Sequence, residues 1–203
     1  MRGALSRLAG GRWADASAFL TLAALMTLLQ LAPADTVEAL RYQRDAVATE
    51  PWRLVTGHLV HADAAHFGWN MLGLLIVGTL FARDYRASEW LVIVLASTTA
   101  TSIGFLLFEP GLAWYVGFSG VLHGCMTAGL VAWLRSSRDW LTALVAALFV
   151  GKLAWEHAMG PLPFTASTLS LPVVYPAHTY GAVGGLVAGL WYSRSRPRDA
   201  ASL

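Results

Sequence analysis

Two residues at the ends of apolar segments have the chemistry of a nucleophile and its base. Ser119 lies in the sequence Gly-Phe-Ser-Gly at 117–120, and His178 opens a second apolar segment. A serine hydroxyl becomes an effective nucleophile when a neighbouring base accepts its proton. Histidine is near-neutral at physiological pH and can be that base. The pair therefore predicts a serine hydrolase in which Ser119 and His178 are catalytic.

A hydrolase of this kind also needs donors for the charge that develops on the attacked carbonyl oxygen. Ser119 is expected to begin a helix, so its backbone N–H and the positive end of the helix dipole can face that charge. His66 and Asn70 are spaced i, i+4 and fall on one helix face, where both can donate. The alternative for Asn70 is a structural hydrogen bond between helices.

Acidic residues are scarce in the apolar segments, which bears on how the base is oriented. No Asp or Glu is expected in the core of a helix beside His178, so the site is predicted to be a Ser-His dyad and not a triad. Lys152 and Glu156, spaced i, i+4, are interpreted as an ion pair at the membrane interface with a snorkelling lysine. A contact with substrate is the alternative.

The remaining histidines are assigned supporting roles. His123 follows Ser119 by one helical turn and is expected to pack against or tune His178, with a second base as the alternative. His58, His61 and His66 raise the possibility of a metal site. Because neither an HExxH motif nor a second ligand cluster accompanies them, no metal and no cofactor is expected.

The elements that position these residues are predicted to be membrane helices. Of the 203 residues, 56% are hydrophobic and 13% charged, and the mean hydropathy is +0.54, which is typical of an integral membrane protein. A signal peptide is the alternative for the first apolar segment, but no convincing cleavage site follows it. We therefore expect an all-α, six-helix bundle in one domain, 1–203, with cytoplasmic tails at about 1–15 and 193–203. The apolar segments run over 16–32, 67–81, 90–108, 119–134, 140–155 and 177–192.

The distribution of arginines predicts the orientation of the bundle. An inside N-terminus leaves only Arg41, Arg44 and Arg53 in a translocated loop, which fits the positive-inside rule and puts both termini in the cytoplasm. The second, fourth and sixth predicted helices then all begin at the outer side of the membrane. His66, Asn70, Ser119 and His178, which lie near these helix starts, are therefore expected at one depth. The pI of 8.9 needs no nucleic-acid partner. The arginines assigned to the cytoplasm are Arg2, Arg7, Arg12, Arg83, Arg86, Arg135, Arg138, Arg194, Arg196 and Arg198.

Small residues predict that the helices beginning at Ser119 and near His178 approach closely. Gly120 and Gly124 form a small-xxx-small pair, and a glycine stripe follows His178. The segment before Ser119 is expected to dip inward as irregular backbone, and the proline-rich loop at 161–176 to cap the cavity as a mobile lid. Cys125 is assigned to packing. The stripe consists of Gly181, Gly185 and Gly189.

Together these residues resemble the rhomboid family of intramembrane serine proteases. The resemblance covers nearly the whole chain, and it implies Ser119 as nucleophile, His178 as base and His66, Asn70 and the Ser119 amide as oxyanion hole. It also implies that Trp52 and Arg53 belong to a first outer loop half-embedded in the membrane. The matching motifs are Glu50-Pro51-Trp52-Arg53 with Thr56, His61, His66-x-x-x-Asn70, Gly117-Phe118-Ser119-Gly120 and Ala177-His178-Thr179-Tyr180-Gly181.

At one position the chain departs from the common rhomboid pattern, and there it resembles the rhombosortase branch. Four residues after the serine, where a tyrosine usually packs on the base, this chain has His123-Gly124. The resemblance implies cleavage of C-terminal tails that carry Gly-Gly, a transmembrane helix and basic residues, near the outer face of a bacterial inner membrane. The acceptor can be water or an amine. The alternatives are a generic rhomboid protease and a non-catalytic rhomboid-like chaperone. The expected partners are single-pass membrane proteins and the lipid bilayer.

Overall fold

Helices of 14 to 22 residues make up most of the protein. A computed structural model describes residues 16–137, 139–163, 167–169 and 171–195. Every predicted apolar segment falls on one of these helices, so their places along the chain are confirmed. The long helices are α2 (Ser17–Gln30), α5 (Ala64–Phe81), α6 (Ala87–Phe108), α7 (Ser119–Ser136), α8 (Trp140–Met159) and α10 (Pro176–Ser195).

Within the described part of the chain, three helices are long and apolar enough to cross a membrane: 64–84, α6 and α8. A fourth span results if α2 and α3 (Ala34–Leu40), which meet at a 118° bend, are counted together. Helices α7 and α10 each contain several glycines and polar residues, and these lower the mean hydropathy of the two helices. The six-span topology therefore stays a prediction. The predicted tail at 1–15 lies outside the described residues, and α10 continues to Ser195, past the predicted boundary at 193.

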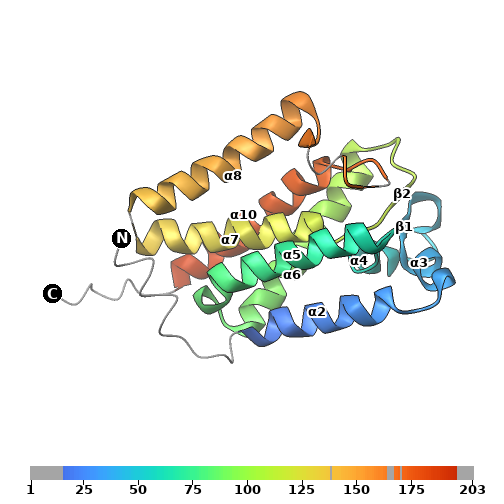
Figure 1. Cartoon of the computed structure of the whole chain (residues 1–203), viewed down its shortest axis with the longest axis horizontal. Helices are drawn as coiled ribbons and strands as arrows, with labels where there is room; N and C mark the ends of the chain where they lie inside the picture. The colour runs from blue at the N-terminus through green and yellow to red at the C-terminus, as the bar shows by residue number, and fades with distance from the viewer. Residues whose placement is uncertain (1–15, 138, 164–166, 170, 196–203) are drawn as a thin grey trace.

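Helix α10 packs against both α7 and α6 (Figure 1). The contact is close because glycines face glycines. A Cβ at Gly181 or Gly185 would overlap the backbone of Gly120 or Gly124 in α7. On the other side, a Cβ at Gly184 would come within 2.5 Å of the Ala96 carbonyl oxygen in α6. The predicted close approach of the two glycine-bearing helices is confirmed.

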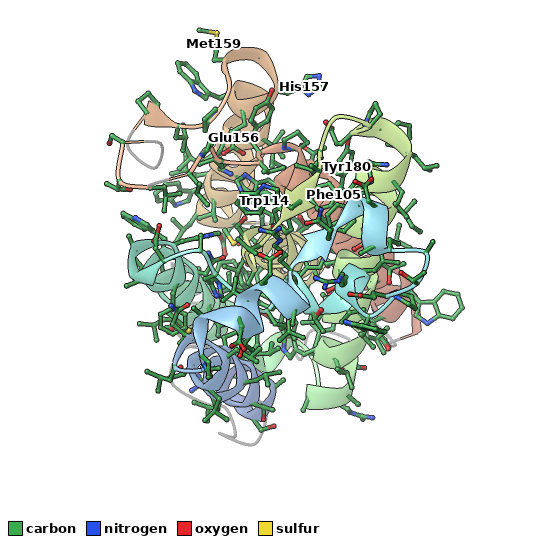
Figure 2. The ribbon with its side chains drawn as sticks, turned by 90° about the vertical axis from the view of Figure 1, so that its right-hand side faces the viewer. Phe105, Trp114, Glu156, His157, Met159 and Tyr180 are labelled. Atoms are coloured by element: carbon green, nitrogen blue, oxygen red, sulfur yellow. The ribbon has the colours of Figure 1, made fainter. Side chains whose placement is uncertain are left out.

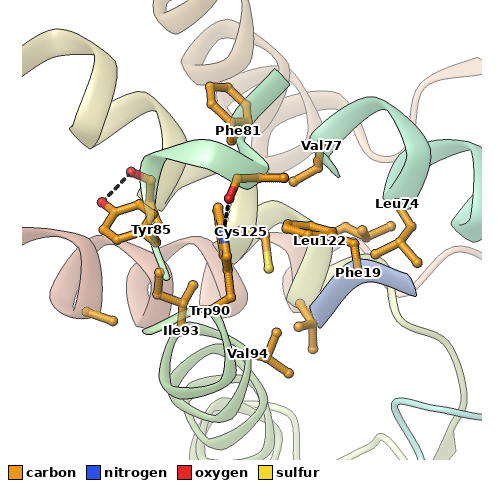
Figure 3. Packing of buried hydrophobic residues seen from close by; sticks show 14 of the residues in the cluster. Phe19, Leu74, Val77, Phe81, Tyr85, Trp90, Ile93, Val94, Leu122 and Cys125 are labelled. Carbon is orange, nitrogen blue, oxygen red and sulfur yellow. Dashed lines mark hydrogen bonds between the residues drawn. The ribbon is translucent and has the colours of Figure 1, made fainter. Parts of the chain in front are cut away.

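A hydrophobic core joins α2, α5, α6 and α7 (Figure 3). Phe19 packs edge-on against Trp90, with ring centroids 4.9 Å apart, a geometry that adds about 1 kcal/mol to area burial. The Trp90 indole N–H donates to the Ala82 carbonyl at 3.0 Å, so the buried ring leaves no polar atom unpaired. Cys125 is buried in this core as a free thiol, and its predicted packing role is confirmed.

Helix α8 lies at the edge of the bundle, alongside α7 (Figure 1). Only Thr142 and Glu156 are buried among its residues. Large apolar side chains such as Leu148 and Val150, 65% and 62% exposed, cover the rest of its surface. Such a face suits lipid. The burial of a glutamate on an otherwise exposed helix therefore needs an explanation from the site.

A two-stranded pairing ties the first loop to the segment that precedes Ser119. Strand β1 (Tyr42–Gln43) runs antiparallel to β2 (Trp114–Tyr115), so this segment is partly strand and not wholly irregular as predicted. The Arg44 guanidinium, between β1 and α6, donates to the carbonyls of Phe105, Glu109 and Leu112, the last at 3.1 Å. The remaining short elements are η2 (Arg44–Ala46), α4 (Arg53–Thr56) and η3 (Ala82–Asp84).

Candidate active site

Ser119 and His178 face each other across the close contact of α7 and α10. Ser119 is the first residue of α7, and His178 lies in the first turn of α10. The His178 Nε2 atom lies 3.0 Å from Ser119 Oγ, within hydrogen-bond distance. The ring is 5% exposed, so it is largely shielded from solvent. The glycine-to-glycine packing of the two helices brings together the two side chains that the sequence predicted to be catalytic.

Gly117 sets the backbone that leads into Ser119. Its φ of 120° lies in the left-handed region that favours glycine. A Cβ at this position would also lie 2.5 Å from His66 Nε2, so the ring fills the space beside the glycine. The Tyr115 hydroxyl donates to the Gly117 carbonyl at 2.7 Å. Steric fit and hydrogen bonding thus fix the turn that presents the serine.

His66 and Asn70 extend from the first two turns of α5 toward the same space. Asp63 caps this helix by accepting the His66 backbone N–H at 2.7 Å. The Asn70 Nδ2 donates to the His66 carbonyl at 2.9 Å, within its own helix. Because an amide nitrogen has two hydrogens, a second donor is available. No hydrogen bond to another helix is observed for Asn70 among the described residues.

All four predicted site residues line one cavity of about 810 Å³. Its walls are mainly apolar and come from α5, α7, α8 and the segment before α7. The loop after α8 also contributes, through Leu169 and 171–174, so the segment predicted to be a lid does face the cavity. A mostly apolar pocket with a few convergent polar groups is the usual form of a binding site.

Glu156 is the main residue of the site that sequence reasoning placed wrongly. Its side chain is buried, 2% exposed, on the side of α8 that faces the bundle, while Met159 projects outward (Figure 2). Its Oε2 lies 2.8 Å from His178 Nδ1. The predicted ion pair with Lys152 exists, at 2.5 Å, and both of its residues line the cavity. The prediction that no acidic side chain contacts His178 is therefore wrong.

Lys152 and His123 complete the polar cluster. Lys152 Nζ lies 2.6 Å from His123 Nε2 and 3.0 Å from His178 Nδ1. The imidazoles of His123 and His178 are stacked, with centroids 4.0 Å apart and an interplanar angle of 14°. The predicted packing of His123 on His178 is confirmed. Its Nδ1 bonds to the Ser119 carbonyl at 2.7 Å, which is not the geometry of a second base acting on the hydroxyl.

Three of these side chains could in principle hold a metal ion. One ligand atom each from His123, Glu156 and His178 lie within 4.8 Å of one another. The Lys152 ammonium, however, contacts all three at 2.5 to 3.0 Å. A cation already part of the protein thus occupies the centre of this donor set.

The two histidines of the first loop, His58 and His61, do not line the cavity. His58 Nε2 bonds to Ser102 Oγ at 3.0 Å, and its ring stacks near Phe105. His61 packs edge-on against His66, with ring centroids 5.2 Å apart. Burial lowers the pKa of His58 to about 4 and that of His61 to about 3, so both rings are neutral at pH 7. Among the described residues these histidines do not form a three-ligand group.

Trp52 and Arg53, implied to support the site, lie in the first loop and do not line the cavity. Arg53 pairs with Glu50 and donates to the carbonyls of Glu38 and Arg41 at 2.8 and 3.0 Å. Trp52 is 50% exposed. Their observed contacts hold the loop together.

Comparison with known proteins decides the family. The model of the rhomboid domain matches residues 48–195, which include α5 to α10 and the whole polar cluster. The chain belongs to the rhomboid family. With its apolar helices, it is an integral membrane protein.

Curated relatives include bacterial and plant rhomboids. The chain is 34% identical over 145 residues to rhomboid protease GluP of Bacillus subtilis, covering 70% of this chain and 25% of the relative. It is 29% identical over 155 residues to the mitochondrial RHOMBOID-like protein 6 of Arabidopsis thaliana, covering 74% and 45%. It is 31% identical over 94 residues to rhomboid protease GlpG of Enterobacter sp. strain 638, covering 46% and 32%. The matches span less than half the length of these relatives.

Proposed function

We propose that this rhomboid is an intramembrane serine endopeptidase with Ser119 as nucleophile and His178 as general base. The observation that carries the proposal is the 3.0 Å contact between Ser119 Oγ and His178 Nε2 inside an apolar cavity. Two relatives of this chain are named as rhomboid proteases, which supports the same activity.

The geometry suits acyl transfer. As Ser119 Oγ bonds to the substrate carbonyl carbon, its proton passes to His178 Nε2 and the carbonyl electrons move onto oxygen. The Ser119 amide at the start of α7, His66 and the second Asn70 hydrogen are the proposed donors to that oxyanion. When the carbon–nitrogen bond breaks, His178 returns the proton to the leaving amine. Water then attacks the acyl-enzyme by the same proton transfers in reverse order.

We further propose a substrate class: single-pass membrane proteins whose C-terminal tails carry Gly-Gly, a transmembrane helix and basic residues. Support comes from His123, which stands in the sequence pattern of the rhombosortase branch and makes direct contact with His178. Transfer of the acyl group to an amine is a variant of the same proposal, because an amine can take the place of water in the last step. A generic rhomboid protease would accept other single-pass substrates.

The proposed setting is a bacterial inner membrane, with both termini in the cytoplasm and the cavity open to the periplasmic side. The arginine distribution supports this orientation. The shared bundle core and the common cavity support one rhomboid-like domain.

Co-expression with a tagged Gly-Gly-tailed reporter tests the proposal. Release of the reporter should be abolished by Ser119→Ala and by His178→Ala, since neither variant can form the acyl-enzyme. Release that persists in Ser119→Ala would refute the nucleophile assignment. Cleavage that is unchanged when Gly-Gly is replaced by Leu-Leu would leave a generic rhomboid protease and remove the substrate class.

A further inference from the structure

A two-residue catalytic pair does not require the buried carboxylate that lies behind His178. Glu156 Oε2 is 2.8 Å from His178 Nδ1, and Ser119 Oγ is 3.0 Å from Nε2 of the same ring. We propose that Glu156 is a positioning residue that holds His178 in the tautomer a base requires, which makes the site a Ser-His-Glu arrangement. The inference rests on the proposed roles of Ser119 and His178.

The location of one hydrogen on the His178 ring decides whether it can act as a base. For Nε2 to accept the Ser119 proton, a neutral imidazole must carry its hydrogen on Nδ1. A carboxylate next to Nδ1 accepts that hydrogen and later stabilises the imidazolium. If the hydrogen is on Nε2 instead, it points at Ser119 Oγ and leaves no lone pair for the serine proton.

Lys152 favours the opposite tautomer. Its Nζ lies 3.0 Å from His178 Nδ1, and an ammonium group has only donors to offer. Two of its three hydrogens have nearer acceptors: Glu156 Oε2 at 2.5 Å and His123 Nε2 at 2.6 Å. Glu156 therefore acts twice, because it accepts from His178 and also engages the group that would otherwise donate to the same ring nitrogen.

His123 makes the hydrogen-bond pattern consistent. Its Nδ1 faces the Ser119 carbonyl at 2.7 Å, an atom that can only accept, so Nδ1 carries the hydrogen. Its Nε2 is then free to accept from Lys152. The ammonium is thus shared between His123 and Glu156. An assignment in which His178 carries its hydrogen on Nδ1, toward Glu156, satisfies all four side chains, and in it His178 Nε2 is the acceptor.

A purely structural role for the ion pair is the competing explanation, since Glu156 is one of only two buried residues on α8. The positioning role and the purely structural role differ in what they predict when Lys152→Met is added to Glu156→Gln. A glutamine would turn its oxygen to Lys152 and its N–H to His178 Nδ1, which favours the inactive tautomer. Removal of Lys152 frees the glutamine oxygen to face Nδ1. The tautomer role therefore predicts that Lys152→Met partly restores the labelling lost in Glu156→Gln. A purely structural role predicts a further loss of labelling.

Labelling of Ser119 by a fluorophosphonate probe in detergent provides the test. For Glu156→Gln, the labelling rate at saturating probe should fall about 100-fold, with the half-saturating concentration unchanged. Adding Lys152→Met should raise that rate about tenfold. Glu156→Asp keeps the charge and should fall between Glu156→Gln and the wild type. It also serves as the readout should Glu156→Gln not fold.

Glu109→Gln is the matched control. Its carboxylate also accepts a hydrogen bond from α10, from the Tyr180 hydroxyl at 2.7 Å, but it does not line the cavity. It should label at the wild-type rate. A wild-type rate for Glu156→Gln, or a further fall on adding Lys152→Met, would overturn the positioning role. Absence of Ser119 labelling in the wild type would instead overturn the proposed function.

Discussion

The Ser119 hydroxyl lies at the first turn of a helix, where the backbone N–H groups have no intrahelical acceptor. The hydroxyl therefore lies beside both His178 Nε2 and backbone N–H groups that the helix itself does not pair. His178 contacts Ser119 through one ring nitrogen and the Lys152–Glu156 pair through the other. The chemistry proposed for the cavity depends on which ring nitrogen carries the hydrogen, a property that the neighbouring charges control.

Histidine protonation also gives a prediction for the first loop. Burial lowers the pKa of His58 to about 4 from its ordinary value of 6.5. The neutral ring contributes stability that is fully present above pH 6.5 and is lost as the pH falls toward 4, because the unfolded chain binds the proton more readily. The loss amounts to about 3 kcal/mol.

We expect His58→Gln to make this pH dependence less steep, since an amide can still donate to Ser102 but does not titrate. The contribution of His61, whose pKa burial lowers to about 3, should remain. The measurement is the thermal midpoint in detergent from pH 7 to pH 4. His157→Gln, at an exposed site on α8, should leave the wild-type slope unchanged. An equally steep slope in His58→Gln would show that another group is responsible.

At the scale of elements, the contact of α7 with α10 sets the distance between Ser119 and His178. Gly185→Leu would place side-chain atoms inside the backbone of Gly124, so the helices must separate. We expect a loss of stability of about 3 kcal/mol and loss of probe labelling. Thermal unfolding in detergent and labelling of Ser119 measure the two effects.

Gly151→Leu is the same substitution at a helical glycine of α8 that has no atom within 4 Å of a Cβ position. It should retain the wild-type midpoint and labelling. Equal behaviour of the two variants would mean that the glycine stripe does not hold the site together.

The sequence was sufficient to predict the long helices, because each apolar segment is long enough to define one, and the glycine stripe indicated which pair approaches closely. Residue types at the helix starts were sufficient to predict that the side chains of Ser119 and His178 lie together. The position of Glu156 could not be predicted, because no pattern reports how far α8 lies from α10. The i, i+4 spacing with Lys152 in an apolar helix was the available signal. The β1–β2 pairing was missed because each strand has two residues.

At the scale of the whole molecule, the proposed orientation can be tested with single cysteines. The native Cys125 is buried, so an added cysteine should be the reactive one. Met159, 69% exposed at the end of α8, is expected on the periplasmic side, and the exposed Ser88 at the start of α6 in the cytoplasm.

A membrane-impermeant maleimide should therefore label Met159→Cys in intact bacterial spheroplasts. Ser88→Cys should react only after the membrane is permeabilised. The wild type, with Cys125 alone, measures the background. The reverse pattern would place the cavity on the cytoplasmic side.

The most direct test of the central claim is to locate the adduct of a fluorophosphonate by mass spectrometry of the detergent-solubilised protein. The account predicts one adduct, on Ser119, that is absent in Ser119→Ala and strongly reduced in His178→Ala. An adduct that forms elsewhere and persists in Ser119→Ala, or an unmodified Ser119 in a folded wild-type protein, would contradict it.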